Sequence, residues 1–155
     1  MNRTFFTLLA SLLMLALSAC SNFDSRFARG VPTGGPDDRF SGTYAGHWAS
    51  SSHPGGGGKL WCILQKQKDA TYLAEFRATW HGVFASEHSI VLHPKRARAG
   101  AGSRTFQGTA ALDTFIGSGT YRCEGTMDGK RMRACYDATY ARGTFDLQRV
   151  APSSR

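Results

Sequence analysis

The sequence has few acidic residues and no sustained helical pattern of hydrophobic residues. Asp and Glu total 11 against 19 Lys and Arg, which gives a formal charge of +8. Sparse carboxylates disfavour the two-carboxylate chemistry of glycoside hydrolysis. Charged residues make up 19% and hydrophobic residues 41% of the 155 residues, so we expect an ordered chain with one domain. Glycine is frequent, with 18 residues and no collagen period, which indicates many turns.

Common motifs of catalytic and metal sites are also missing. The chain contains no Gly-x-Ser-x-Gly nucleophile elbow, no His-Glu-x-x-His pair and no Cys-x-x-Cys spacing. His81, His88 and His93 lie near one another in the sequence, with Glu87 beside them, but their spacing fits no zinc motif. The sequence therefore predicts no catalytic residue, no metal site and no cofactor.

The first residues have the pattern of a secretory signal peptide. Arg3 supplies a positive charge, and an apolar or small-residue stretch follows from Phe5 to Ala19. This stretch is shorter than the ~20 residues that a membrane-spanning helix needs. We therefore expect residues 1–19 to be a signal peptide, and export excludes a nucleic-acid partner in the cytosol.

The signal peptide ends in Leu17-Ser18-Ala19-Cys20, which resembles the lipobox of bacterial lipoproteins. The resemblance implies cleavage before Cys20 and acylation of its thiol, so that acyl chains anchor the protein to a membrane. Ser21 replaces the Asp that is typical of inner-membrane retention, which favours the outer membrane with the domain facing the periplasm. An ordinary signal peptide that happens to contain a cysteine is the alternative.

Residues 20–40 are expected to form the lipidated Cys20 and a flexible tether. Two Pro and three Gly interrupt Ser21–Phe40, and no periodicity is sustained. Phe23, Phe27 and Phe40 are candidates for docking on the domain or on the bilayer. At the other end of the chain, residues 151–155 are expected to be a disordered tail.

From Ser41 onward the dominant hydrophobic period is two. Tyr72, Phe76 and Trp80, for example, alternate with Leu73 and Glu75. Such alternation places one face of a strand in a core and the other in water. We therefore expect residues 41–150 to be an all-β domain, a small antiparallel up-and-down barrel of about eight strands, with a sandwich as the alternative. The expected strands are 42–48, 59–66, 71–80, 83–93 (where both faces carry apolar residues), 104–112, 118–125, 130–139 and 142–149.

A Gly-Thr-aromatic triplet begins at Gly42, Gly119 and Gly143. The first and last expected strands both start with it, which favours their pairing and closure of the barrel, although Gly-Thr is also common at turns. Together with the Gly-x-Tyr-x-Gly-x-Trp start at Gly42 and the Gly-x-Phe-x-Leu-x-Arg end at Gly143, the domain resembles the small, lipocalin-like β-barrel lipoproteins of bacteria. The resemblance implies fold and envelope location and carries over no catalytic residue.

Three cysteines remain once Cys20 is acylated, and an oxidising compartment favours one disulfide among them. Cys123 and Cys135 flank the Asp128-Gly129 turn and are the favoured pair. A two-residue loop would place their side chains on opposite faces, so this pairing requires a bulge or a three-residue loop. Cys62 is expected to lie across the barrel from Cys123, beyond the ~7 Å Cα separation that a disulfide spans.

Two function classes fit these features. In the first, the barrel is a binding module for a small apolar or amphipathic ligand, although the same aromatic rings would also suffice to fill an eight-stranded barrel. The candidate ligand-lining residues are Tyr44, Trp48, Phe76, Trp80, Phe106, Tyr121 and Tyr136.

In the second class, the outer surface of the domain contacts another envelope component. Lys95, Arg96 and Arg98 form a basic loop cluster that suits an envelope protein, the cell wall or the phosphates of lipopolysaccharide. The alternative for this cluster is a solvated loop without a partner.

Overall fold

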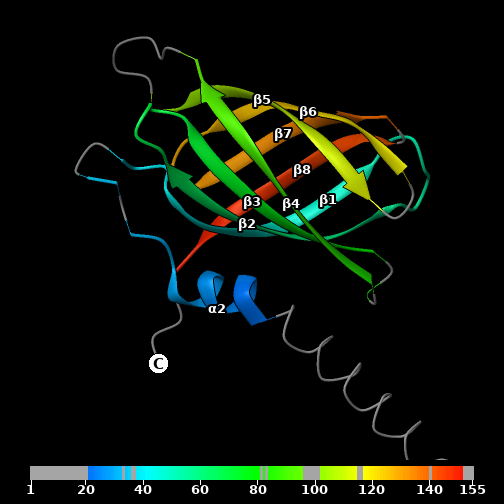
Figure 1. Cartoon of the computed structure of the whole chain (residues 1–155), viewed down its shortest axis with the longest axis horizontal. Helices are drawn as coiled ribbons and strands as arrows, with labels where there is room; N and C mark the ends of the chain where they lie inside the picture. The colour runs from blue at the N-terminus through cyan, green and yellow to red at the C-terminus, as the bar shows by residue number, and fades with distance from the viewer. Residues whose placement is uncertain are drawn as a thin grey trace, which may run out of the picture.

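The chain forms a closed antiparallel barrel of eight strands, preceded by one short helix (Figure 1). The computed structural model describes residues 21–32, 34–35, 38–80, 82, 84–95, 102–114, 117–139 and 141–151. Among these residues, no helix is long and apolar enough to cross a membrane. The elements are α2 (Ser21–Arg29), β1 (Gly42–Ser50), β2 (Gly57–Lys66), β3 (Tyr72–Trp80), β4 (Phe84–Pro94), β5 (Arg104–Thr114), β6 (Gly117–Met127), β7 (Arg131–Ala138) and β8 (Ala141–Val150).

Each strand pairs with the next along the chain, and β1 pairs with β8 to close the barrel. The predicted up-and-down barrel is confirmed, and the sandwich is excluded. At the closing seam Gly46 lies opposite Leu147, and a Cβ atom on Gly46 would lie only 2.0 Å from the Asp146 carbonyl oxygen. Glycine at this position therefore allows the close approach of β1 and β8.

Inward-facing and outward-facing residues alternate along the strands. On β7, Met132 and Ala134 are buried whereas Arg133 and Cys135 are exposed. The ambiguous strand β4 turns Ile90 and Leu92 inward, and it leaves Val91 outside. The buried face of each strand thus forms one continuous core inside the barrel.

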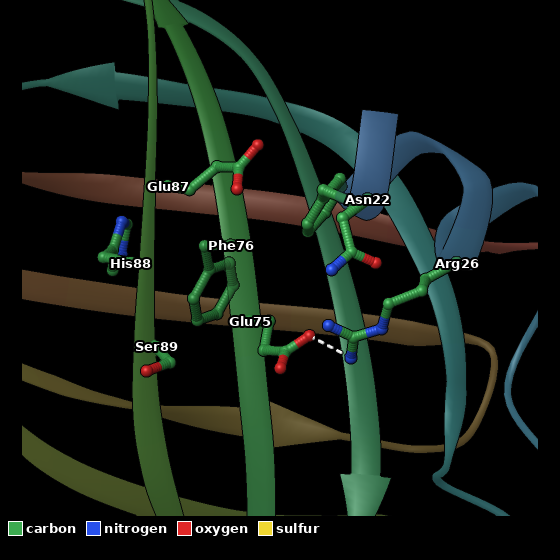
Figure 2. Close-up of a pocket in the computed structure, with 8 residues that line it drawn as sticks. Asn22, Arg26, Glu75, Phe76, Glu87, His88 and Ser89 are labelled. Atoms are coloured by element: carbon green, nitrogen blue, oxygen red, sulfur yellow. Dashed lines mark ion pairs between the residues drawn. The ribbon is translucent and has the colours of Figure 1, made fainter. Parts of the chain in front are cut away.

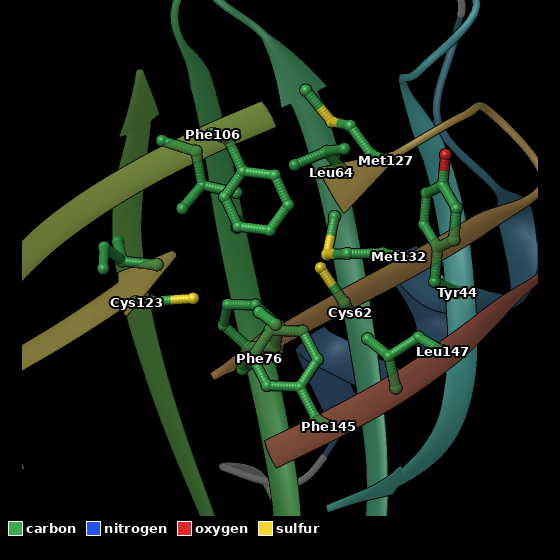
Figure 3. Packing of buried hydrophobic residues seen from close by; sticks show 14 of the residues in the cluster. Tyr44, Cys62, Leu64, Phe76, Phe106, Cys123, Met127, Met132, Phe145 and Leu147 are labelled. Atoms are coloured by element: carbon green, nitrogen blue, oxygen red, sulfur yellow. The ribbon is translucent and has the colours of Figure 1, made fainter. Parts of the chain in front are cut away.

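One half of the interior, which we call the packed end, is filled by side chains (Figure 3). It lies where β1 begins and β8 ends. Its residues are at most 1% exposed, so this half has the close packing of an ordinary protein core. They are Phe40, Tyr44, Leu64, Leu92, Phe106, Met127, Met132 and Leu147.

Arg149, near the end of β8, closes the packed end. Its Nη1 donates to the carbonyl oxygens of Arg39 and Gly129 at 2.9 and 3.0 Å, and its Nη2 donates to that of Ser41. The guanidinium also lies 5.8 Å from the centroid of the Tyr44 ring, a cation–π distance. One side chain therefore connects the entry to β1, the β6–β7 turn and the aromatic core.

The expected flexible tether is wrong for two parts of Ser21–Phe40. Residues Ser21–Arg29 form α2, and Phe23 is only 5% exposed where the helix packs on the outer face of β2. Burial of Asp38 would raise the pKa of its carboxyl, but hydrogen bonds, with Ser41 foremost, hold that pKa below its usual value. Residues leading into β1 thus belong to the barrel, and Cys20 lies outside the described residues.

The expected Cys123–Cys135 disulfide is also wrong. Both cysteines are free, because Cys123 faces the core and Cys135 faces outward. The turn has a two-residue loop, Gly129-Lys130, one residue later than expected, with φ of 85° at Gly129. This loop keeps the alternation intact, so Cys123 lies opposite Tyr136 and its sulfur is on the other face of the sheet from Cys135.

Candidate binding site at the aromatic end

The opposite half of the interior, which we call the aromatic end, is lined by Trp48, Trp80, His88, Tyr121 and Tyr136. These side chains come from five different strands, because the inward parity of each strand places one ring at this level. Trp48, Trp80 and Tyr136 are only partly buried, in contrast to the side chains of the packed end. The aromatic end is therefore the part of the interior whose rings are partly exposed to solvent.

The rings of the aromatic end contact one another in a continuous series. Trp48 lies 5.7 Å from Trp80 and 6.4 Å from Tyr136, both with edge-to-face geometry. Tyr136 stacks on Tyr121 at 5.9 Å, and Tyr121 meets His88 edge-on at 5.3 Å. Such contacts hold rings in fixed orientations, so this surface is organised before any ligand arrives.

Hydrogen bonds to the backbone also fix two of these rings. Trp48 Nε1 donates to the carbonyl oxygen of Thr79 at 3.1 Å, which links β1 to β3 across β2. The Tyr136 hydroxyl donates to the carbonyl oxygen of Ala49 at 3.5 Å. Both polar atoms are therefore satisfied within the protein, and the ring faces remain as the apolar surface for a ligand.

The seam between β4 and β5 is paired only at the packed end. Its register covers Leu92–Pro94 of β4 and Phe106–Gly108 of β5, whereas Phe84–Val91 pair only with β3. The two strands diverge away from their paired ends (Figure 1). The part of β4 that carries His88 therefore has no hydrogen-bonded strand on its β5 side.

His88 carries a buried polar atom of the aromatic end that lacks a hydrogen-bond partner. Its ring stacks on Phe76 at 5.3 Å, and its Nε2 is buried without a hydrogen-bond partner. Burial lowers the pKa of the imidazole from 6.5 to about 4, so the ring is neutral near pH 7. An unpaired buried nitrogen costs stability and is a ready partner for a ligand's polar group.

The predicted ligand-lining residues divide between the two ends. Trp48, Trp80, Tyr121 and Tyr136 meet at the aromatic end. Phe76 is buried at the boundary, against His88 and Phe145. Tyr44 and Phe106 belong to the packed end, so assigning them to a ligand surface is corrected: they are core residues.

His88 was missing from the predicted ligand-lining set, although the sequence holds a signal for it. His88 shares its parity with Ile90 and Leu92, which face the core. Among the described residues no three His, Cys, Asp or Glu side chains converge as metal ligands. Within the described part of the chain, His88 therefore belongs to no cluster of metal ligands.

The predicted basic cluster is described only at Lys95. This residue is exposed, and its backbone nitrogen donates to the Thr105 carbonyl oxygen at 2.9 Å. Arg96 and Arg98 lie outside the described residues. On the outer face of β7, Arg131 and Arg133 both pair with Asp146 of β8, which offsets part of their charge.

A polar groove of about 280 Å³ lies outside the barrel, between α2 and the β3–β4 hairpin (Figure 2). It is lined by Asn22, Phe23 and Arg26 of the helix, by Glu75 and Phe76 of β3, and by Glu87, His88 and Ser89 of β4. Arg26 crosses the groove to form an ion pair with Glu75. This groove is therefore a feature of the helix–barrel contact that shares His88 with the aromatic end and Phe76 with its boundary.

Comparison of the chain with protein-family models, with curated proteins and with solved structures finds no match. The residues of the chain itself therefore carry what is known of its chemistry. The aromatic end offers the clearest chemistry among them.

Proposed function

We propose that this chain is a lipid-anchored protein of the bacterial cell envelope that binds a small apolar or amphipathic ligand at the aromatic end. The observation that carries the proposal is the unpaired Nε2 of His88, set among partly buried aromatic rings. Binding sites for small molecules are commonly apolar surfaces with a few placed polar groups. Both parts of that description are met at this end of the barrel.

The residues specify the chemistry of such a ligand. Trp48 and Trp80 offer ring surface to a flat or aliphatic body. His88 Nε2 would pair with one polar group of the ligand, such as a hydroxyl or a carboxyl group. The ligand is therefore mostly apolar, with one hydrogen-bonding group at the end that enters the barrel.

We propose that the protein is anchored at Cys20, at the end of the lipobox-like segment. The proposed location is the outer membrane, with the domain facing the periplasm. The test compares wild type with Cys20→Ala in a bacterial host, by membrane fractionation and by labelling with a radioactive lipid precursor. We expect the variant to lose both the label and its sedimentation with the membrane. Unchanged labelling and sedimentation would exclude lipidation at this residue.

Ligand binding is tested with fluorescent probes on the chain that starts at Ser21, which contains α2 and all eight strands. The probes are N-phenyl-1-naphthylamine, which is apolar, and a dansylated fatty acid, which adds a carboxyl group. We expect saturable binding of both probes, weakened about tenfold by Trp48→Ala, equivalent to ~1.4 kcal/mol. His88→Phe should weaken only the fatty acid, because the apolar probe has no carboxyl group for Nε2.

Trp61→Ala is the matched control for the loss of a tryptophan. Trp61 lies on β2 with outward parity, between the inward-facing Leu60 and Cys62. Its removal should leave both dissociation constants unchanged. Non-saturable binding, or equal weakening by Trp61→Ala and Trp48→Ala, would overturn the proposed site.

A further inference from the structure

The two exposed large hydrophobic side chains among the described residues both lie on β4. Phe84 is 64% exposed and Val91 is 40% exposed. Phe84 begins the strand at the tip of the β3–β4 hairpin, directly opposite Trp80, so its side chain has the inward parity of Trp80 and is exposed at the rim of the aromatic end. The core does not use this phenyl ring, and an exposed aromatic residue at a hairpin tip suits an apolar partner.

Helix α2 is held on the outer face of the barrel, against β2 and β3. Its Phe23 is buried against the sheet, and two ion pairs flank that contact. One joins Asp24 to Arg77 and the other joins Arg26 to Glu75, both on β3. A helix fixed at three points cannot act as a flexible spacer.

The direction of α2 brings the start of the helix toward the hairpin. Going backward from Arg26 to Asp24, the ion-pair partners advance from Glu75 to Arg77, toward the tip of the hairpin. Asn22 lines the same groove as Glu87 and Ser89 of β4 (Figure 2). Glu87 is three residues from Phe84, which corresponds to about 10 Å along a strand.

The start of α2 therefore lies toward the rim of the barrel at which Phe84 is exposed. Cys20 immediately precedes Ser21, so its Cα lies only ~3.8 Å from that of the first residue of the helix. Acyl chains on Cys20 would leave no free linker between the bilayer and the docked helix. The bilayer must then lie against whatever surface surrounds the start of α2.

We infer that the anchored barrel lies with α2 and the β3–β4 hairpin against the bilayer, with Phe84 in the membrane interface. This inference rests on the proposed anchoring at Cys20. An aromatic residue at the headgroup level gains burial of its ring while the neighbouring polar residues stay hydrated. In this orientation the aromatic end opens beside the membrane surface, where amphipathic ligands concentrate.

The test places an environment-sensitive NBD fluorophore at one cysteine of the full chain. Phe84→Cys is compared with Thr126→Cys, an exposed position on β6 near the packed end, both with Cys135→Ser. The lipidated proteins are reconstituted into phosphatidylethanolamine–phosphatidylglycerol vesicles that contain a nitroxide-labelled lipid. We expect the nitroxide to quench more than half of the emission at position 84 and to leave position 126 unquenched.

A second variant tests the role of the helix. Glu75→Lys sets a cation against Arg26, and Glu124→Lys adds the same charge at an exposed site on β6 as a control. Uncoupling the helix should reduce quenching at position 84 at least twofold while the protein remains on the vesicles, and the control should not. Circular dichroism confirms that each variant is folded.

The outcomes separate the orientation from the anchoring. Vesicle-bound protein with equal quenching at positions 84 and 126 would overturn the orientation and leave the anchoring intact. Protein that stays off the vesicles, with Cys20 reactive toward maleimide, would overturn the anchoring and the orientation with it. Unchanged quenching in Glu75→Lys would show that Phe84 reaches the bilayer without the docked helix and would refute its role.

Discussion

Replacing His88 by Phe tests whether the aromatic end sacrifices stability for a polar group. Phenylalanine keeps a ring against Phe76 and Tyr121, which contact the imidazole at 5.3 Å each. It removes the buried Nε2 that has no partner. Because replacing an unsatisfied buried polar group by an apolar one of similar shape is neutral or favourable, we expect His88→Phe to be about 1 kcal/mol more stable at pH 7.

The pH dependence gives the larger and more specific signal. The pKa of His88 falls from 6.5 to about 4 on folding, with burial as the cause. The unfolded chain therefore binds the proton more tightly between these two pH values. The free energy of unfolding is highest above pH 6.5 and decreases as the pH falls toward 4. At ~1.4 kcal/mol per pKa unit, His88 accounts for a loss of roughly 3 kcal/mol.

The assay is urea unfolding followed by circular dichroism at several pH values between 7 and 4. With a slope of ~1.5 kcal/mol per molar urea, the wild-type midpoint should fall by about 2 M over this range because of His88 alone. The urea midpoint of His88→Phe should therefore fall by about 2 M less than that of wild type over the same pH range. Asp38 and Asp146 have pKa values lowered below 3.8 by hydrogen bonds and ion pairing, so their contribution is lost at lower pH.

The matched control is His93→Gln, on the same strand but exposed to solvent. This variant should retain the wild-type pH dependence. A His88→Phe protein whose urea midpoint falls as steeply as that of wild type between pH 6.5 and 4 would refute the assignment of a buried neutral imidazole.

Arg149→Met should destabilise the fold by about 2 kcal/mol, because three carbonyl oxygens at the packed end lose a charged donor. Arg133→Met, which removes an exposed ion pair, should change the free energy of unfolding by less than about 0.5 kcal/mol in the same urea titration. Equal effects would show that Arg149 does not close the barrel. Maleimide should modify only Cys135 in the folded chain that starts at Ser21, because Cys62 and Cys123 are buried and burial raises the pKa of both thiols. Mass spectrometry that finds two adducts without denaturant would contradict this arrangement.

The strands of the barrel could be predicted because alternation is a local signal. The triplets at Gly42 and Gly143 also pointed to the pairing of the first and last strands, which the register of β1 and β8 confirms. Trp48, Trp80 and Tyr136 were correctly placed inside for the same reason. Alternation reports the face of a side chain, but it does not report its level along the barrel axis. Only the register between strands separates the packed end from the aromatic end.

Features that depend on tertiary contacts could not be predicted. Helix α2 has only nine residues, too short to be stable from local interactions alone, and its stability comes from Phe23 and two ion pairs with the sheet. The state of Cys123 and Cys135 depends on the length of the loop between them, and the observed two-residue loop places their side chains on opposite faces. The divergence of β4 from β5 has no counterpart in the hydrophobic pattern of either strand.

The division of the barrel into two ends explains how it tolerates the features proposed for binding. The seam at β4 forgoes backbone hydrogen bonds along Phe84–Val91, and His88 holds a buried nitrogen without a partner. Both features reduce stability where a ligand would be held. The packed end offsets that loss with close-packed side chains and with the clamp at Arg149. A ligand that pairs with His88 and covers the unpaired edge of β4 would restore part of the missing stability. Binding should therefore raise both the melting temperature of the barrel and its resistance to unfolding at low pH.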